Sequence, residues 1–347
     1  MLLIVALALF GSWPRCDRVA RAEANADRLE QQPPGRAGGA TTPRGGRSAV
    51  SIAVGSTGPA QDLPRFKAES ELVVLHVMVK DRSGSYVPGL TADAFRVLED
   101  NRPQATSLFA SEDAPVTIGL VIDSSGSMQN ARDRVIAASA AFVETSNPQD
   151  EVFALVFNDD VHPVLTSSAP FTSDANTLKT ALSNVFQPVG RTSLYDALAD
   201  GLSYVTKATR DRRVLVVLSD GGDNASRATL SDALMLAQAS NTVVYTIALI
   251  HPLDANADPG RLKRFAETSG GTAFSPRRVE DVGRAFEQVA RDVRHGYAIG
   301  YVPDVPVGEQ GFRRLRVEVR SPDGRQLVTR TRTGYVAGHV NDGDLAR

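Results

Sequence analysis

The chain has 347 residues, of which 42% are hydrophobic and 22% are charged, and its formal net charge is -2. This balance is that of an ordinary globular protein with room for two domains, and it excludes a chain dominated by disorder. The near-neutral charge also excludes bulk electrostatic attraction to nucleic acid or to an acidic membrane surface, so we expect a local site to select the partner.

Residues 1–22 predict a leader for export. The apolar run at residues 2–10 is too short to span a bilayer and is followed by Pro14 and Arg15. No basic residue precedes the run, which leaves an uncleaved leader or a misplaced start codon as alternatives. The only cysteine, Cys16, lies in this leader, so the mature chain would have no disulfide. We therefore predict an exported protein, periplasmic, extracellular or attached to the cell surface, without an integral membrane span in the mature chain.

Residues 23–64 are rich in Gly, Pro, Ala, Ser and Arg, a composition typical of a linker. Beyond residue 66 the pattern changes to the period-two alternation of a strand, which ends in a turn at residues 81–84. Residues 87–91 and 95–101 predict further strands and turns. One side of the alternation consists of Val73, Leu75, Val77 and Val79, and the other of Val74, His76, Met78 and Lys80. His76 is expected to be an interior or edge side chain of the strand and not a ligand.

A short apolar run at Val116 to Ile122 predicts a buried parallel strand that enters a polar loop. Asp123, Ser125 and Ser127 alternate along this loop, which we interpret as an extended turn with its bend at Gly126, so that their three oxygens can converge. With no His or Cys nearby in the sequence, the donors are oxygens only. Such a set suits Mg²⁺ best, with Mn²⁺ and Ca²⁺ as alternatives, and disfavours Zn²⁺ or Cu²⁺.

Two later segments repeat this pattern. Thr192 follows a loop and precedes a predicted helix, and Asp220 follows the apolar strand at 214–218 and precedes two glycines. In open α/β sheets, ligands bind at the carboxyl ends of the strands, where these segments arrive. Each segment alone has an ordinary interpretation as a capping turn, a helix cap or a tight turn. Their order and spacing together favour a cation site, whereas the nearby Asp159, Asp160 and Asp223 are expected to be solvated loop carboxylates.

Strands and helices alternate through the middle of the chain. This order predicts an α/β domain with a doubly wound, mostly parallel sheet. The strands are expected at 116–122, 152–157, 214–218 and 243–249; the helices carry the apolar stripes Val135, Ile136, Ser139, Phe142 and Val143, then Leu194, Leu198, Leu202 and Val205, then 230–239, and finally Val282, Phe286, Val289 and Val293.

Residues 312–320 alternate apolar and mostly basic side chains, turn at 321–324, and return as a partner strand at 326–335. The arginines allow a nucleic-acid or heparin patch, but their period-two spacing favours a solvated sheet face. Because few strands flank the α/β domain on each side, neither group could bury a face alone. We therefore expect them to pair in an accessory β-sandwich-like domain. The predicted divisions are 66–112 and 296–338 for this domain, 115–295 for the α/β domain inserted between its halves, and 339–347 for a tail.

Residues 123–128, 190–198 and 218–221 together resemble the metal-ion-dependent adhesion site of the von Willebrand factor type A domain. The resemblance covers roughly 115–295 and implies a Rossmann-like fold. It also implies that the metal is bound, directly or through water, at five positions that are all intact here, and that an Asp or Glu of a partner protein completes the metal shell. These positions are Asp123, Ser125, Ser127, Thr192 and Asp220.

A second resemblance extends over most of the chain after residue 66. The segments 79–81, 89–91, 93–100 and 296–301 are similar to those of a bacterial, acidobacterial-type family of exported type A proteins. That family is poorly characterised, so the resemblance implies no defined activity.

A cation held by a few protein oxygens, with water in its remaining positions, can accept a carboxylate from a partner. We therefore expect a metal-dependent protein-binding or adhesion module. One alternative is an envelope assembly scaffold that needs no metal. The other is a metal-dependent hydrolase, which the sequence disfavours because the three loops supply no His, Lys or Cys as general acid or base and no Gly-x-Ser-x-Gly motif. We expect no enzymatic activity and assign no catalytic residue.

Overall fold

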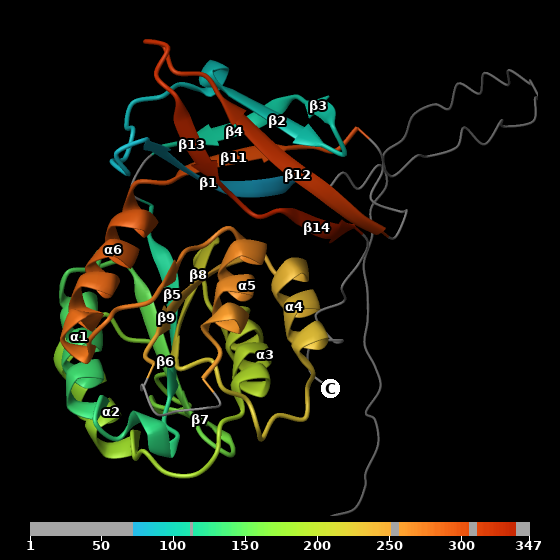
Figure 1. The fold of residues 1–347 in the computed structure, drawn as a ribbon. Coiled ribbons are helices and arrows are strands. Elements are labelled where there is room, and N and C mark those ends of the chain that lie inside the picture. The colour runs from blue at the N-terminus through green and yellow to red at the C-terminus, as the bar shows by residue number, and fades with distance from the viewer. Residues whose placement is uncertain (1–71, 112–113, 251–256, 305–310, 338–347) are drawn as a thin grey trace, which may run out of the picture. The chain divides into compact units, whose positions relative to one another are not determined.

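The computed structural model describes residues 72–111, 114–250, 257–304 and 311–337 (Figure 1). The predicted leader at 1–22, the linker at 23–64 and the tail at 339–347 lie outside these ranges. Within them, no helix is both long enough and apolar enough to cross a membrane.

The middle of the chain forms a six-stranded sheet in the order β10-β9-β8-β5-β6-β7. All neighbouring pairs are parallel except the pair of β6 with the edge strand β7. This confirms the predicted doubly wound, mostly parallel sheet. The bounds are Val116–Asp123 for β5, Glu151–Phe157 for β6, Val161–Pro163 for β7, Arg212–Ser219 for β8, Thr242–Ala248 for β9 and Ala273–Phe274 for β10.

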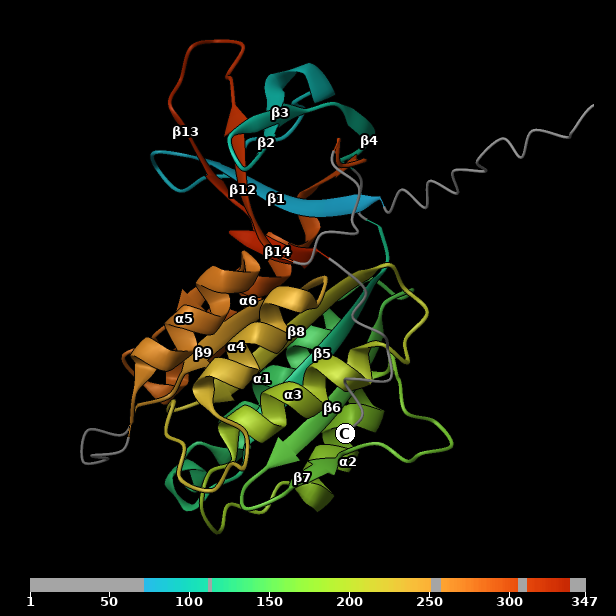
Figure 2. The same cartoon turned by 90° about the vertical axis from the view of Figure 1, so that its right-hand side faces the viewer.

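Helices cover both faces of this sheet (Figures 1 and 2). One apolar core contains α1, α2 and α6, and the other contains α3, α4 and α5. The stripe predicted for α1 is buried along its whole length. Two helices, α2 and α5, were not predicted from the sequence. The helices are α1 at Arg132–Glu144, α2 at Ala175–Val185, α3 at Leu194–Val205, α4 at Leu230–Ala239, α5 at Pro259–Ser269 and α6 at Val282–Arg294.

The flanking strands form two four-stranded sheets, β13-β1-β11-β4 and β14-β12-β2-β3. Each sheet contains strands from before and after the α/β domain, and the apolar side chains of both sheets share one core. The sandwich-like arrangement of the flanking strands is therefore as predicted. The bounds are Val73–Asp81 for β1, Phe95–Glu99 for β2, Arg102–Gln104 for β3, Thr106–Ala110 for β4, Tyr297–Tyr301 for β11, Gly311–Val319 for β12, Leu327–Arg330 for β13 and Gly334–Ala337 for β14.

One local prediction was wrong. Residues 326–335 do not return as one partner strand, because β13 pairs with β1 in one sheet and β14 pairs with β12 in the other. The chain changes sheets between these two short strands, which is how a sandwich turns a corner. Of the segments predicted as strands and turns, residues 87–91 form a loop with Gly89 at a φ of +76°, and Val87 and Leu90 are buried in the sandwich core.

The predicted alternation of β12 is confirmed, with exposed Arg314 and Arg316 and buried Leu315 and Val317. Arg313 lies on the same buried face as Leu315 and Val317, although its side chain is charged. It forms an ion pair with the buried Glu99, with 2.6 Å between Nη1 and Oε1. The other oxygen of Glu99 accepts hydrogen bonds from the hydroxyls of Tyr301 at 2.5 Å and Tyr335 at 2.9 Å. This network ties β2, β11, β12 and β14 together inside the sandwich.

Strand β1 packs against other elements on both of its faces. Leu75, Val77 and Val79 belong to the sandwich core, whereas Met78, on the opposite face, belongs to the core of the α/β domain. Lys80, on the same face as Met78, forms an ion pair with Asp292 of α6 at 3.2 Å. One strand thus packs against both halves of the described fold.

We expect Arg313→Met to lower the free energy of unfolding by about 3 kcal/mol, because it leaves the buried carboxylate of Glu99 without its cation. Urea unfolding would measure the change. The control is Arg316→Met, which removes an exposed ion pair with Glu318 and should cost less than about 1 kcal/mol. Equal losses in the two variants would contradict the importance of the buried network.

Candidate metal centre

Four of the five predicted metal ligands gather at the carboxyl ends of β5 and β8. Asp123 ends β5 and is fully buried. The hydroxyl of Ser125 lies 3.0 Å from that of Ser127, and the Ser127 hydroxyl donates to Oδ2 of Asp220 at 2.8 Å. The backbone N–H of Ser125 donates to Oδ1 of Asp123 at 2.8 Å. A continuous series of short contacts therefore links the first loop to the third.

The shape of the first loop differs from the prediction. Ser125 is extended, but Gly126–Met128 forms a 3₁₀ turn, so Ser127 reaches Asp220 from a helical turn and not from an extended one. Gly126 has no positive φ, and a Cβ there would meet only the carbonyl oxygen of Gly190 at 3.8 Å. The bend therefore does not require glycine at this position.

The second loop lies directly against the first. The N–H of Gly126 donates to the carbonyl of Gly190 at 3.3 Å, and the N–H of Val189 donates to the carbonyl of Ser124 at 2.9 Å. The hydroxyl of Ser124 donates to the carbonyl of Gln187 at 2.9 Å. These bonds hold the segment that precedes Thr192 against the first loop.

Thr192 itself is buried and is held by its main chain. Its N–H donates to the side-chain oxygen of Asn224 at 2.9 Å, and its carbonyl accepts from the N–H groups of Asn224 and Ala225. Thr192 is therefore bound to the third loop, four residues beyond Asp220. It is not a helix cap, because the residue that precedes α3 is Ser193.

The third loop needs glycine after Asp220. Gly221 has a φ of +84°, and a Cβ there would lie 2.2 Å from the carbonyl oxygen of Asp258. The N–H of Gly222 donates to Oδ1 of Asp220 at 2.8 Å, which fixes the orientation of this carboxylate. The pair of glycines thus allows Asp220 to turn back toward the first loop.

Sequence reasoning missed the side chains that join the second and third loops. Asp223 and Ser226 both accept from the N–H of Tyr195, at 3.1 and 3.0 Å, and so satisfy the first turn of α3. In return, Asp196 of α3 accepts from the N–H groups of Arg227 and Ala228, at 3.0 and 2.9 Å. The two loops are therefore locked reciprocally, and the prediction that Asp223 is merely solvated was wrong.

Asp159 also has a structural partner. Its carboxylate accepts from Nε of Arg191 at 2.7 Å and from the N–H of Arg191 at 3.1 Å. This pair ties the loop after β6 to the segment before Thr192. Asp160 is exposed, as predicted.

The buried carboxylate of Asp123 lies in an electrostatic environment that disfavours its negative charge. Burial, together with the nearby carboxylate of Asp220, raises the pKa of Asp123 to about 6, although hydrogen bonds from Ser125 and Ser219 act in the opposite direction. The Ser219 hydroxyl donates to Oδ2 of Asp123 at 2.6 Å. A divalent cation beside these carboxylates would favour their ionised forms.

The donor set fits a hard cation in composition. Within the described ranges, no three His, Cys, Asp or Glu side chains gather into a group that could hold a metal. The candidate centre instead combines two carboxylates with three hydroxyls, and such all-oxygen sets suit Mg²⁺ with water in its remaining positions. The residues that would hold the ion are Asp123, Ser125, Ser127, Thr192 and Asp220.

The fold is a doubly wound α/β domain, and these loops lie at the carboxyl ends of its strands, where open α/β sheets generally bind their ligands. Residues 117–288 match the family model of the von Willebrand factor type A domain. The chain therefore carries a type A domain over these residues. Comparison with curated proteins finds no match.

The chain is similar to several solved structures. A von Willebrand factor type A protein from Catenulispora acidiphila has 15% identity and a TM-score of 0.45, over 81% of this chain and 78% of that chain. The vWF domain of the type V pili tip protein Mfa5 from Porphyromonas gingivalis has 15% identity and a TM-score of 0.43, over 52% and 95%. The PilB minor pilin from Streptococcus sanguinis has 13% identity and a TM-score of 0.44, over 53% and 62%.

The raised pKa of Asp123 predicts a pH-dependent stability in the absence of metal. The folded state holds the proton of Asp123 more tightly than the unfolded state does. Its contribution to the free energy of unfolding is therefore complete below pH 4 and is lost as pH rises to about 6, by about 3 kcal/mol in total. Asp123→Asn removes this titrating group. The free energy of unfolding of the variant, relative to that of the unaltered protein, should therefore rise over the same pH window. Urea unfolding in EDTA from pH 4 to 7 would test this, and parallel pH profiles of the two proteins would contradict it.

Asn224→Ala should weaken Mg²⁺ binding about 10- to 100-fold, because the segment carrying Thr192 loses its side-chain acceptor. Asn224→Asp keeps that acceptor and should bind Mg²⁺ at least as tightly as the unaltered chain. Titration calorimetry would measure both, with the exposed Asn176→Ala of α2 as the control. Unchanged affinity in Asn224→Ala would show that Thr192 is positioned without this contact.

Proposed function

We propose that this chain is a metal-dependent protein-binding module. In this proposal Mg²⁺, or alternatively Mn²⁺ or Ca²⁺, is held by Asp123, Ser125, Ser127, Thr192 and Asp220, and an Asp or Glu side chain of a partner protein completes its shell. The observation that carries the proposal is the direct contact between Ser125, Ser127 and Asp220, which come from two loops 93 residues apart.

The charges of the donor set favour a partner carboxylate. Two ionised carboxylates balance one divalent cation, and the three hydroxyls add no charge. The remaining positions of a bound Mg²⁺ would hold water, which a carboxylate can replace without making the centre strongly negative. A site built only from carboxylates would repel such a partner.

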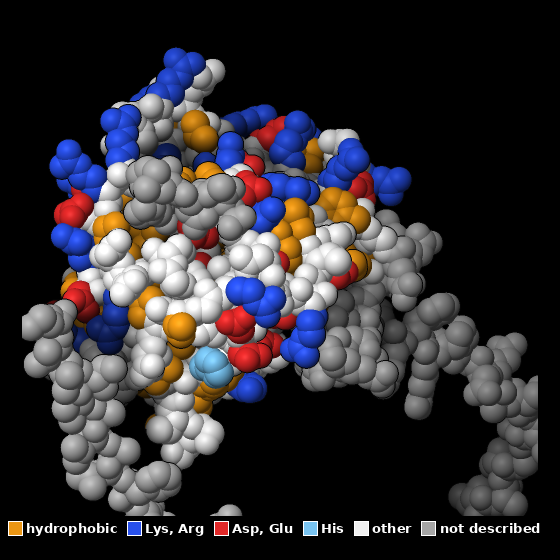
Figure 3. All heavy atoms as spheres, turned by 60° about the horizontal axis from the view of Figure 1, so that its bottom comes forward, with side chains coloured by type: hydrophobic (Ala, Val, Ile, Leu, Met, Phe, Trp, Pro, Cys, Tyr) orange, Lys and Arg blue, Asp and Glu red, His pale blue; other side chains and the backbone are white. Residues whose placement is uncertain are grey.

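The residues in and around the candidate centre range from buried to exposed. Asp123 and Asp220 are buried, Ser127 is partly buried, and Gly126, Val189 and Gly190 are exposed. Figure 3 views the end of the domain at which the parallel strands finish, where basic and acidic side chains lie beside one another. Because basic and acidic side chains are mixed on that view, long-range electrostatic attraction is not expected to select the partner. This supports selection of the partner by the centre itself.

We further propose that the protein has no enzymatic activity, because the three loops contain no His, Lys or Cys that could act as a general acid or base. The leader-like residues 1–22 and the resemblance to exported bacterial type A proteins support an exported or surface location. The partner would then be another exported or surface protein.

A scaffold that needs no metal is the second candidate. The hydrogen bonds that Asp223 and Asp196 accept from the main chain of the facing loops favour it, because they join the second and third loops through protein groups alone. A scaffold would keep its partner in the presence of a chelator, whereas the metal-dependent module would lose it.

The decisive measurement is Mg²⁺ binding by the purified protein. We expect a single site, and at a hundredfold excess over its Kd we expect Mg²⁺ to raise the free energy of unfolding by about 3 kcal/mol. Asp123→Ala should abolish both effects, whereas the exposed Asp160→Ala should not. No uptake of Mg²⁺, Mn²⁺ or Ca²⁺ by the unaltered chain in calorimetry would overturn the proposal.

Partner capture separates the two candidates. An envelope fraction from the source organism would be passed over the immobilised protein with Mg²⁺ or with EDTA. We expect proteins that are retained with Mg²⁺, released by EDTA and absent with Asp123→Ala. Retention that survives EDTA would favour the scaffold.

A further inference from the structure

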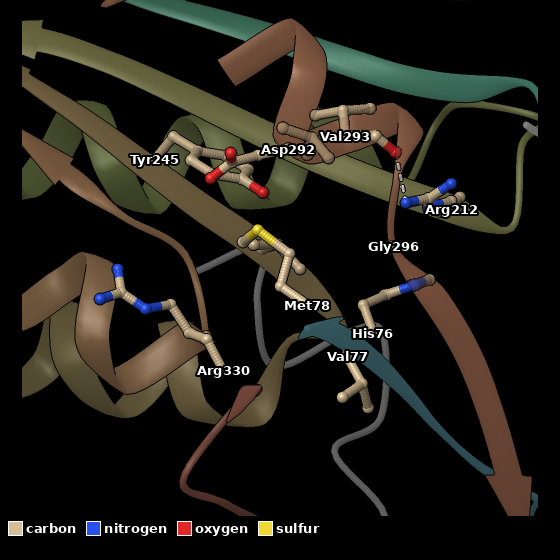
Figure 4. Close-up of a pocket in the computed structure, with 12 residues that line it drawn as sticks. His76, Val77, Met78, Arg212, Tyr245, Asp292, Val293, Gly296 and Arg330 are labelled. Carbon is tan, nitrogen blue, oxygen red and sulfur yellow. Dashed lines mark hydrogen bonds between the residues drawn. The ribbon is translucent and has the colours of Figure 1, made fainter. Parts of the chain in front are cut away.

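Strand β1 carries a histidine on the face that it turns toward the α/β domain. His76 and Met78 point to this side, whereas Val77 points away from it, into the sandwich core (Figure 4). We call the contact of this face of β1 with β8, β9 and α6 the seam. Two small cavities border His76 there, with volumes of about 20 and 10 Å³, so that each has room for one water molecule at most.

The ring of His76 has no partner in the seam. Both ring nitrogens are buried and have no hydrogen-bond partner among the described residues. A neutral ring leaves one N–H donor unsatisfied there, whereas a protonated ring would leave two donors and a positive charge. Burial is the main reason that the pKa of His76 is lowered to about 3, and the positive charges of Arg212 and Arg332 act in the same direction. The closed seam therefore favours the neutral ring.

Three arginines line the cavities around His76. They are Arg212 of β8, Arg330 of β13 and Arg332, which follows β13. Each of them donates to a main-chain carbonyl, and these carbonyls belong to Val293, Gly271 and Val74 respectively. Guanidinium groups have donors only, so none of the three can accept a hydrogen bond from a protonated ring.

Asp292 of α6 is the one carboxylate in the described linings of the two cavities. It accepts from Lys80 at 3.2 Å and from Gln288 at 2.9 Å, and it makes no hydrogen bond with His76. Burial raises the pKa of Asp292, so its protonation in acid stabilises the closed seam and acts against His76. Burial also raises the pKa of Tyr245 of β9, so this phenol stays neutral wherever His76 titrates.

We propose that His76 makes the seam an acid-sensitive contact between the sandwich and the α/β domain, which opens when the ring takes up a proton. In the open state water solvates the protonated ring, while Leu75, Val77 and Val79 on the other face of β1 keep the sandwich core together. An apolar side chain would fill the position of His76 without an unsatisfied donor. The histidine thus costs stability and gives the fold a response to pH.

The direction of the response follows from the two protonation equilibria of His76. The pKa of the ring is 6.5 when it is exposed and about 3 in the closed seam. The contribution of the neutral ring to closure is therefore complete well above pH 6.5 and is lost as pH falls toward 3. His76 alone raises the ratio of open to closed molecules about tenfold for each pH unit in this window, or about 30-fold between pH 7.5 and pH 5.

Methionine oxidation tests the opening on the unaltered chain. Met78 is buried in the seam, Met128 is buried within the α/β domain, and Met235 of α4 is exposed. Hydrogen peroxide converts accessible methionines to sulfoxides, and peptide mass spectrometry in EDTA would give the rate at each one. Relative to Met235, we expect Met78 to be oxidised at least about tenfold faster at pH 5 than at pH 7.5. The rate at Met128 should not rise, because the titration of Asp123 stabilises the α/β domain as pH falls.

Two results on the unaltered chain would overturn the proposal. One is a rate at Met78 that is the same at both pH values. The other is an equal rise at Met78 and Met128, which would show general unfolding in acid and not opening of the seam. Because EDTA is present throughout, neither result depends on metal binding at the other end of the domain.

His76→Phe separates the ring from the other groups that titrate. Phenylalanine fills a similar space and takes up no proton, so the rate at Met78 should not rise at pH 5 in this variant. His76→Leu provides the same comparison with a smaller side chain, and the exposed His162→Phe of β7 should behave as the unaltered chain does. An acid-induced rise at Met78 that both variants of His76 retain would assign the response to other groups and overturn the proposal.

Discussion

The complete burial of β5 is the constraint on which the candidate centre depends. Every residue of this strand is buried between its parallel neighbours β6 and β8, including Asp123 at its end. A carboxylate in that position must be satisfied by nearby donors. The donors come from Ser125 in the following loop and from Ser219 at the end of β8, so two loops distant in sequence are fixed relative to one another by one side chain. Asp220 then follows Ser219 directly.

Much of this architecture could be predicted from the sequence because the buried parallel strands are continuous apolar runs, each followed by a polar loop. The gathering of Ser125, Ser127 and Asp220 followed from that pattern. The contacts of Asn224, Asp223 and Asp196 could not be predicted, since they join irregular loops about 30 residues apart and leave no periodic signal. The 3₁₀ turn at Gly126–Met128 and the division of residues 326–335 between two sheets escaped prediction for the same reason, because short segments are set by tertiary packing and not by local pattern.

The two ends of the α/β domain have different chemical characters. At the carboxyl ends of the strands, carboxylates and hydroxyls gather, and a cation would balance their charge. At the opposite end, the arginines of β8 and β13 meet the carbonyl ends of helices, and β1 covers the seam with His76 and Met78. Strand β1 also belongs to the sandwich core, so it joins the sandwich to the α/β domain. Separating the two halves would expose apolar side chains of this strand and lose their burial.

The order of strands in the sandwich has a consequence for biosynthesis. Strand β4 ends at Ala110, and its sheet neighbour β11 begins only at Tyr297. At the usual speed of a ribosome, roughly 10–40 seconds separate the emergence of these two partners. During that interval β1 to β4 have exposed edges and apolar faces, while the intervening residues already contain all six strands of the parallel sheet. The nascent chain therefore passes through a stage in which its first strands lack their partners and can pair with strands of other chains.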